Sequence, residues 1–216
     1  MLYLTVKFYL FKENIKVIYY FYKDLSFALT DALFLGINSL SNPYRVCRKF
    51  YQKKKGEKGN IYGETPLTTL RKICHLSGIH SRDRVIELGS GRGRTCFFLS
   101  KVVGSSVKGI EKVPSFVRKA HLIQKMLRLE NVQFSCEDFF EVDYSDTNVV
   151  YLYAPQFEEK KILSLCEKLR ALPKGAKVIT ISYSLNDYAP EDFQKIKRFS
   201  VSFPWGTTHA YLSIRG

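Results

Sequence analysis

The chain has 216 residues, enough for one large domain with its own core, or for one domain with an additional arm. Apolar residues make up 45% of it and aromatic residues 14%, which excludes an intrinsically disordered protein. The formal net charge of +14 implies an acidic partner, such as RNA, DNA or an anionic membrane surface.

The five cysteines are scattered, and they form neither a CxxC pair nor a cluster with the four histidines at ligand spacing. This pattern predicts reduced thiols in a cytosolic protein and no metal site. The N-terminus lacks the basic, apolar and small-residue regions of a signal peptide. The most apolar stretch, LSFALTDALFLGINSL, is interrupted by Asp31, so we expect no ordinary membrane span.

Residues 1–60 are expected to form a basic, mainly helical arm and linker, because they hold eleven Lys and Arg against four Asp and Glu. Apolar side chains recur there at steps of three and four, which predicts one face of a long helix. They are Phe11, Ile15, Ile18, Tyr22, Leu25, Leu29 and Leu33. The first ten residues alternate instead and could form a strand. A short helix should follow SNP, and RKFYQKKKGEKGN is interpreted as a basic linker, either solvated or in contact with lipid headgroups or RNA.

From residue 61 to the end, predicted strands and helices alternate. A helix over 64–79 precedes a buried strand in RVIELG and a helix in RGRTCFFLSKVVG. Later strands are expected in SVKGIEK, VQFSCEDFF, NVVYLYAP and PKGAKVITISYSL, and helices in PSFVRKAHLIQKMLRL and QFEEKKILSLCEKLRAL. Two β-rich runs around a Pro-Trp-Gly turn end the chain. This order predicts an α/β, Rossmann-like, doubly wound and mostly parallel sheet with a C-terminal antiparallel hairpin.

A glycine-rich loop follows the first of these strands, and Glu87 stands two residues before it. Alternate glycines allow a sharp turn and let backbone N–H groups approach a ligand closely. A pyrophosphate site would have a glycine where this loop has Arg94, and Glu87 would repel the phosphates. The loop therefore favours a ligand with an amino group. Its predicted ligand-binding residues are Gly89, Ser90, Gly91 and Gly93.

Two further predicted strands end in acidic residues. Glu111 lies about 20 residues past the loop, where a carboxylate can accept both ribose hydroxyls. In CEDFF, Glu137 or Asp138 can accept from an adenine amino group while Phe139 packs on the ring. Parallel α/β sheets bind ligands at the carboxyl ends of their strands, so three such ends predict one adenosine-containing ligand.

These residues resemble the class I methyltransferases that use S-adenosyl-L-methionine. VIELGSGRGR is similar to their first motif, GIE to their ribose acid, and CEDFF to their adenine-side acid and aromatic residue. The resemblance implies a methyltransferase domain over residues 61–216 and S-adenosyl-L-homocysteine as the product. It also implies a sheet whose final antiparallel hairpin closes one edge.

Two longer stretches are similar to the small non-SET protein-lysine methyltransferases, including the ATP synthase c-subunit lysine methyltransferases and their archaeal relatives. They are YGETPLTTLRKICHLSGIHSRDRVIELGSGRGR and NVVYLYAPQFEEKKILSLCEKLRALPKGAKVITISYSL. The resemblance implies that Tyr62 and Thr65 help to hold the methionine end of the cofactor. It also matches Trp205 and the His-Ala-Tyr of residues 209–211 to the group's terminal motif. LYAP differs from the NPPY or DPPY of amino-methylating nucleic-acid enzymes, and a charge-interrupted arm replaces the apolar anchor of eukaryotic members.

Methyl transfer to lysine requires a neutral amine, correct positioning and exclusion of water. Aromatic side chains suit that task, so Tyr153 at the tip of the fourth strand is the candidate catalytic residue, with a core tyrosine as the alternative. The substrate-side candidates are Tyr183, Trp205 and His209. The remaining histidines, His75, His80 and His121, are expected on the surface.

Three functions stay open from the sequence. The first is a protein-lysine methyltransferase with a protein substrate, and the second is an RNA methyltransferase, for which the net charge of +14 argues. The third is a module that binds the cofactor without catalysis. We expect a cytoplasmic protein, with peripheral contact of residues 1–60 to an anionic membrane as an additional option. The methyl acceptor and the oligomeric state do not follow from the sequence.

Overall fold

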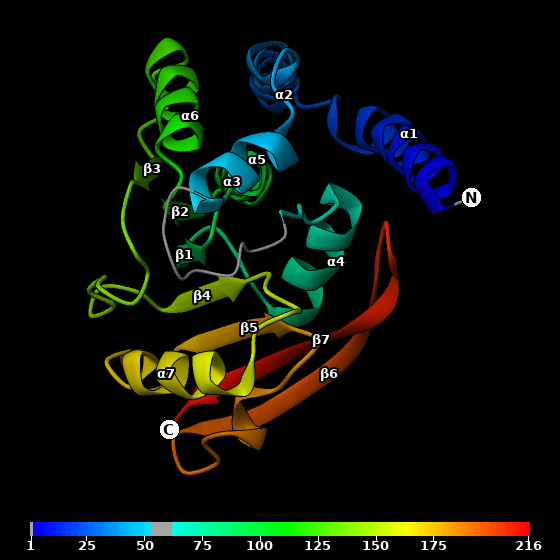
Figure 1. Ribbon diagram of the computed structural model, residues 1–216. Coiled ribbons are helices and arrows are strands. Elements are labelled where there is room, and N and C mark those ends of the chain that lie inside the picture. The colour runs from blue at the N-terminus through cyan, green and yellow to red at the C-terminus, as the bar shows by residue number, and fades with distance from the viewer. Residues whose placement is uncertain (1, 53–61) are drawn as a thin grey trace.

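The computed structural model describes residues 2–52 and 62–216, and a seven-stranded sheet forms its centre (Figure 1). The strands are β1 (Arg84–Leu88), β2 (Ser106–Ile110), β3 (Val132–Ser135), β4 (Val149–Leu152), β5 (Lys177–Ile181), β6 (Phe193–Phe203) and β7 (Gly206–Arg215). Their order across the sheet is β3-β2-β1-β4-β5-β7-β6. Strands β1 to β5 pair in parallel, and β7 pairs antiparallel with both β5 and β6. The predicted Rossmann-like sheet with its antiparallel C-terminal hairpin is confirmed.

Helices cover both faces of the sheet. They are α1 (Leu2–Phe21), α2 (Leu25–Asn38), α3 (Pro43–Gln52), α4 (Leu67–Ser77), α5 (Arg94–Phe98), α6 (Pro114–Met126) and α7 (Glu159–Leu169). A π-helical turn η1 (Leu99–Val103) continues α5, and a 3₁₀ turn η2 (Leu185–Asp187) follows β5. None of the described helices is both long and apolar enough to cross a membrane.

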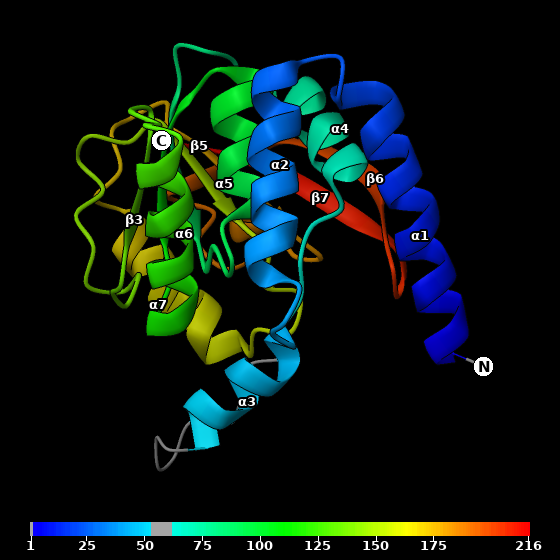
Figure 2. The ribbon, with the colours of Figure 1, turned by 90° about the horizontal axis from the view of Figure 1, so that it is seen from above.

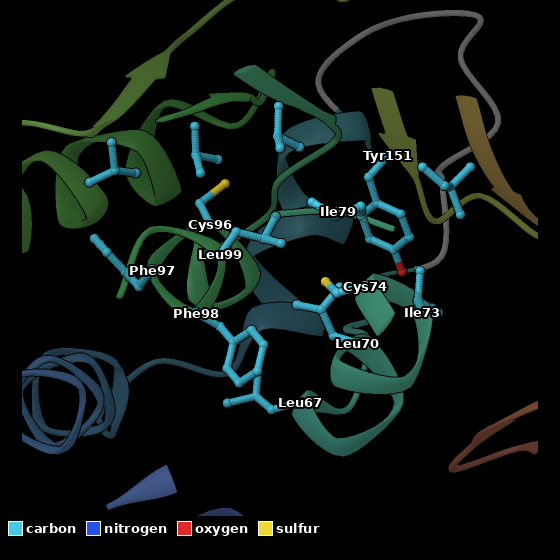
Figure 3. Close-up of a cluster of buried hydrophobic side chains, with 14 of the residues drawn as sticks. Leu67, Leu70, Ile73, Cys74, Ile79, Cys96, Phe97, Phe98, Leu99 and Tyr151 are labelled. Carbon is cyan, nitrogen blue, oxygen red and sulfur yellow. The ribbon is translucent and has the colours of Figure 1, made fainter. Parts of the chain in front are cut away.

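Successive side chains of the central strands point to opposite faces, as the pleat requires. Val85 and Tyr151 pack into the larger core cluster with α4, α5 and α6, whereas Ile86 and Val150 pack into the cluster under α7. Both faces of β1 and β4 are therefore buried, which explains their continuous apolar runs. Figure 3 shows Tyr151 reaching from β4 toward α4, where Ile73 and Cys74 lie.

The N-terminal segment differs from two sequence-based predictions. The proposed strand in the first ten residues is wrong, because α1 is already helical from Leu2. The proposed single long helix is also wrong: α1 ends at Phe21, and Asp24 caps the separate helix α2 by accepting hydrogen bonds from the backbone N–H groups of Ser26 (2.9 Å) and Phe27 (3.1 Å). A side-chain acceptor at this position starts a new helix and changes its direction.

The described part of residues 1–60 packs directly on the sheet domain. Phe21 and Phe27 meet Phe98 edge to face, with ring centroids 4.9 Å and 5.7 Å apart, and Phe34 meets Phe97 at 6.4 Å. These side chains belong to the same buried cluster as α4 and α5. The helix predicted after SNP is α3, which extends to Gln52. The rest of the predicted linker and the predicted boundary at residue 61 lie outside the described residues.

Candidate functional site

The glycine-rich loop joins β1 to α5 at the carboxyl edge of the sheet. Its three glycines have φ angles of 74°, 55° and 86°, a region that L side chains rarely adopt. The N–H groups of Gly89 and Ser90 both donate to the carbonyl oxygen of Ile110 at 2.9 Å, which holds the loop against the end of β2. A Cβ at Gly89 would meet no atom within 4 Å, so the loop leaves open space on that side.

Gly93→Ala should destabilise the protein by about 2 kcal/mol more than Gly89→Ala. A Cβ at Gly93 would lie 2.6 Å from Cε1 of Phe134, a ring packed in the core, whereas at Gly89 only the backbone strain is added. Urea unfolding of both variants measures the difference as a shift in the midpoint at constant slope. Equal midpoints would show that Phe134 moves aside at no cost.

Glu87 lies buried beneath this loop. Its carboxylate accepts hydrogen bonds from Oγ1 of Thr95 at 2.5 Å and from Sγ of Cys96 at 3.0 Å. Burial raises the pKa of Glu87 to about 7, although both hydrogen bonds lower it. This carboxyl group therefore changes charge near neutral pH. Thr95 and Cys96 were not among the predicted site residues, since a hydroxyl and a thiol at the start of an apolar helix are typical of core positions.

Glu111 reaches the same loop from the end of β2. Oε2 accepts from the N–H of Gly91 at 2.9 Å, and Oε1 accepts from the N–H of Val113 at 2.8 Å. Burial raises the pKa of Glu111, and these backbone donors act in the opposite direction. The structure thus brings the predicted ribose acid next to the predicted loop.

The two acids that follow β3 each lie beside a lysine. Oε1 of Glu137 is 4.0 Å from Nζ of Lys108, and Oδ2 of Asp138 is 2.8 Å from Nζ of Lys112. The ring of Phe139 packs on Phe140 and Phe157, with centroids 4.7 Å and 6.1 Å away. Both acids therefore pair with lysines of the β2 region, and Phe139 belongs to an aromatic group beside the α7 core.

A small hollow, partly open to solvent, lies between the loop and the end of β4. Its lining includes four of the predicted cofactor residues and the predicted catalytic residue. The lining residues are Gly63, Glu64, Thr65, Glu87, Gly89, Ser90, Arg94, Thr95 and Tyr153. Oγ1 of Thr65 is 2.5 Å from the hydroxyl oxygen of Tyr151, and this hydrogen bond fixes the orientation of the Thr65 side chain.

Glu64 is held in this lining by a bidentate ion pair. Nε and Nη2 of Arg92 donate to its two carboxylate oxygens, both at 2.8 Å, and Tyr62 donates to the same carboxylate. Burial would raise the pKa of Glu64, but the hydrogen bonds and charge of Arg92 outweigh it, so the pKa is lowered. Tyr62, predicted to lie at the methionine end, therefore contacts the site through Glu64.

A second bidentate ion pair connects α2 to the hollow. Nε and Nη2 of Arg94 donate to Oδ1 and Oδ2 of Asp31, each at 2.8 Å. Asp31 is 1% exposed and also accepts from the hydroxyl of Tyr22 at 3.0 Å. In the sequence, Asp31 is recognisable only as an interruption of an apolar stretch. No local pattern links it to a partner 63 residues away.

Tyr153 lies directly after β4 in a stack of aromatic rings. Its hydroxyl accepts from Nε1 of Trp205 at 2.8 Å, and its ring stacks on Phe203 with centroids 4.8 Å apart. Phe203 stacks in turn on Trp205 at 5.4 Å. We call these three residues the aromatic wall. Trp205 was a predicted substrate-side candidate, whereas Phe203 was not identified.

The other two substrate-side candidates lie elsewhere. Ser182 has a φ of 76°, which turns the chain after β5 and directs Tyr183 into the core under α7, on the opposite face from the core cluster that Tyr153 packs against. The ring of His209 contacts Arg198 instead, with Nδ1 3.1 Å from Nη2. The structure therefore groups Tyr153 with Trp205 and not with Tyr183 or His209.

His75, His80 and His121 are exposed, as predicted. Within residues 2–52 and 62–216, no group of three or more His, Cys, Asp or Glu side chains is arranged to hold a metal ion. All five cysteines are free thiols.

The chain is similar to several known methyltransferases. The family model of the ANTKMT methyltransferase domain matches residues 87–192. The H3 lysine-79 specific histone-lysine N-methyltransferase of Dictyostelium discoideum is 28% identical over 166 residues, covering 68% of this chain and 8% of that protein. Norajmaline N-methyltransferase of Rauvolfia serpentina is 28% identical over 110 residues, 49% of this chain and 38% of that protein.

Among solved structures, an RNA methyltransferase from Salinibacter ruber in complex with S-adenosyl-L-homocysteine is similar with a TM-score of 0.56 and 26% identity. The match covers 69% of this chain and 93% of that chain. The chain spans less than half the length of either curated relative.

Proposed function

We propose that this chain, a class I S-adenosylmethionine-dependent methyltransferase, methylates lysine side chains of a protein substrate. The observation that carries the lysine proposal is the aromatic wall beside the hollow. Aromatic faces attract an ammonium group and its methylated products, and they exclude the water that would compete for the methyl group. The match to the ANTKMT methyltransferase domain supports the same substrate class.

The residues around the hollow fit the cofactor. Space is open beside Gly89, and the carboxylates of Glu64 and Glu87 in the lining suit the ammonium group of the cofactor's amino-acid end. Glu111, already turned toward the loop, suits the ribose hydroxyls. When bound, the cofactor would supply an electrophilic methyl group, to which an acceptor nitrogen would bond in line as the carbon–sulfur bond breaks and S-adenosyl-L-homocysteine leaves.

Tyr153 orients the acceptor and does not remove its proton. Burial raises the pKa of Tyr153, although the hydrogen bond from Trp205 lowers it, so the phenol stays protonated at neutral pH. The indole N–H occupies one lone pair of the hydroxyl oxygen and fixes its position. The second lone pair remains to accept an N–H of the substrate amine, which leaves the nitrogen lone pair free to attack the methyl group. The amine must then lose its proton as it leaves water, because desolvation lowers the pKa of an ammonium group.

RNA methylation is the second candidate. The match to the Salinibacter ruber RNA methyltransferase and the net charge of +14 favour it.

The two candidates can be separated by incubating the purified chain with methyl-labelled cofactor and either total cell protein or total RNA. We expect label in protein, recovered as methyl-lysine by mass spectrometry of peptides. Label in RNA alone, falling steeply as salt is raised, would replace the lysine proposal by the RNA proposal. Label in neither, with cofactor binding intact, would contradict both.

Tyr153→Phe should lower the rate of methyl transfer about tenfold, because the hydroxyl that orients the acceptor is lost. Cofactor affinity should not change, since the ring and its stack on Phe203 remain. Rates with saturating cofactor and calorimetric titration of the cofactor measure the two effects separately. Tyr188→Phe is the matched control, because Tyr188 packs on Tyr183 in the α7 core. An unchanged rate in Tyr153→Phe would remove Tyr153 from the acceptor site.

A further inference from the structure

The N-terminal helices present large apolar side chains to solvent. We define the outer apolar face by four residues of α1 and two of α2, each between 52% and 81% exposed. They are Phe8, Phe11, Ile15, Ile18, Leu25 and Leu29. All of these except Phe8 belong to the apolar stripe predicted for one long helix, and in the structure they lie outside the core.

A different stripe of α1 makes the contact with the rest of the protein. Val17 and Phe21 are buried, and the Glu13 carboxylate accepts from the N–H (2.9 Å) and Oγ1 (2.7 Å) of Thr68 on α4. With 3.6 residues per turn, this stripe and the outer apolar face lie on opposite sides of the helix. Figure 2 shows α1 and α2 on the same side of the molecule, in front of the sheet. Helix α1 is thus apolar on two sides, and the protein itself covers one of them.

The charges around this face have one sign. All seven Lys and Arg side chains of residues 2–52 are exposed, among them Lys12 and Lys16 beside the stripe of α1. Of the three acidic side chains in that segment, Glu13 and Asp31 are buried and directed inward, which leaves Asp24. Nζ of Lys12 lies 4.3 Å from the ring centroid of Phe8, so cationic and apolar groups share one surface.

We propose that the outer apolar face docks on an anionic lipid surface. Apolar side chains of a surface helix enter the boundary between headgroups and acyl chains, while lysines reach the phosphates above it. Anionic headgroups match the unbalanced positive charge of residues 2–52. A second copy of the chain fits less well, because the same face would bring seven exposed cations against seven others.

The test is co-sedimentation of the full chain with vesicles of phosphatidylcholine, with or without phosphatidylglycerol. Binding to the mixed vesicles should be about tenfold tighter and should weaken at high salt. The variant Phe11→Ser/Ile18→Ser should lose about tenfold in affinity for the mixed vesicles, and Lys12→Glu/Lys16→Glu should lose the preference for phosphatidylglycerol. Both pairs are exposed, so cofactor titration should show that the fold is retained.

The matched control is Leu163→Ser/Ile196→Ser, which removes apolar side chains that are 41% and 51% exposed on α7 and β6. It should bind the mixed vesicles as the unchanged chain does. Equal binding to both kinds of vesicle, or equal loss in the control, would overturn the proposal. A different occupant would also overturn it. In that case the unchanged chain would not bind vesicles, sedimentation velocity would show that it self-associates, and the Phe11→Ser/Ile18→Ser variant would no longer self-associate. None of these readouts needs a methyl acceptor, so the result is independent of the proposed function.

Discussion

Asp31→Asn is expected to weaken S-adenosylmethionine binding about 100-fold and to lower the free energy of unfolding by about 3 kcal/mol. Asp31 is almost fully buried and holds both guanidinium nitrogens of Arg94, which lines the hollow. Removing the negative charge leaves the Arg94 cation buried beside the glycine-rich loop without compensation. The cationic side chain must then move toward water and away from its place in the lining.

Calorimetric titration and urea unfolding measure the two effects, with Asp24→Asn as the matched control. Asp24 carries the same charge on the same helix, is exposed, and can be replaced by asparagine without loss of the N-cap. The double variant Asp31→Asn/Arg94→Gln removes both charges and should recover stability without recovering cofactor affinity. If the double variant recovered both stability and cofactor affinity, the ion pair would have only a structural role. Normal cofactor affinity in Asp31→Asn would contradict the prediction directly.

Cofactor affinity should depend on pH through Glu87. In the ligand-free protein the pKa of this carboxyl group is about 7 because of burial, whereas an ammonium group bound beside it favours the ionised form. Affinity should therefore fall about tenfold for each pH unit below about 7 and level off above it. Glu87→Gln should lose this dependence and bind about 100-fold more weakly at about pH 8.

Titration calorimetry of the cofactor between about pH 5.5 and about pH 8 measures this pH dependence of affinity. Repeating the titration in buffers of different ionisation enthalpy gives the number of protons taken up or released on binding. Glu141→Gln, on the exposed segment after β3, serves as the control. Binding by the unchanged chain that is constant over this range would show that Glu87 does not meet the ammonium group.

The same carboxyl group makes stability depend on pH with a defined sign. The folded pKa of Glu87 is raised from 4.5 to about 7, so its contribution to ligand-free stability is complete below about 4.5 and is lost as pH rises through 7. The loss amounts to about 3 kcal/mol, at about 1.4 kcal/mol for each pKa unit. Glu87→Gln should remove this part of the decline in urea midpoints between acidic and neutral pH.

For residues 62–216, local spacing along the chain predicted the alternation of strands and helices, the parallel sheet with its hairpin, and the position of the glycine-rich loop between β1 and α5. It also placed Glu111 near that loop, because the carboxyl ends of neighbouring parallel strands meet at one edge whatever the rest of the fold does. Predictions of this kind depend on periodicity and on glycine conformations within a few residues of each other.

Only the tertiary structure decided which distant residues meet. Asp31 with Arg94 and Trp205 with Tyr153 are 63 and 52 residues apart, and no local pattern relates them. The left-handed backbone at Ser182 turned Tyr183 away from the hollow, although serine does not require that conformation. The apolar stripes of α1 look alike in the sequence. Which stripe is buried depends on the elements that pack against it. The spacing of apolar residues shows only where the two faces lie around the helix, and not which face packs against the rest of the protein.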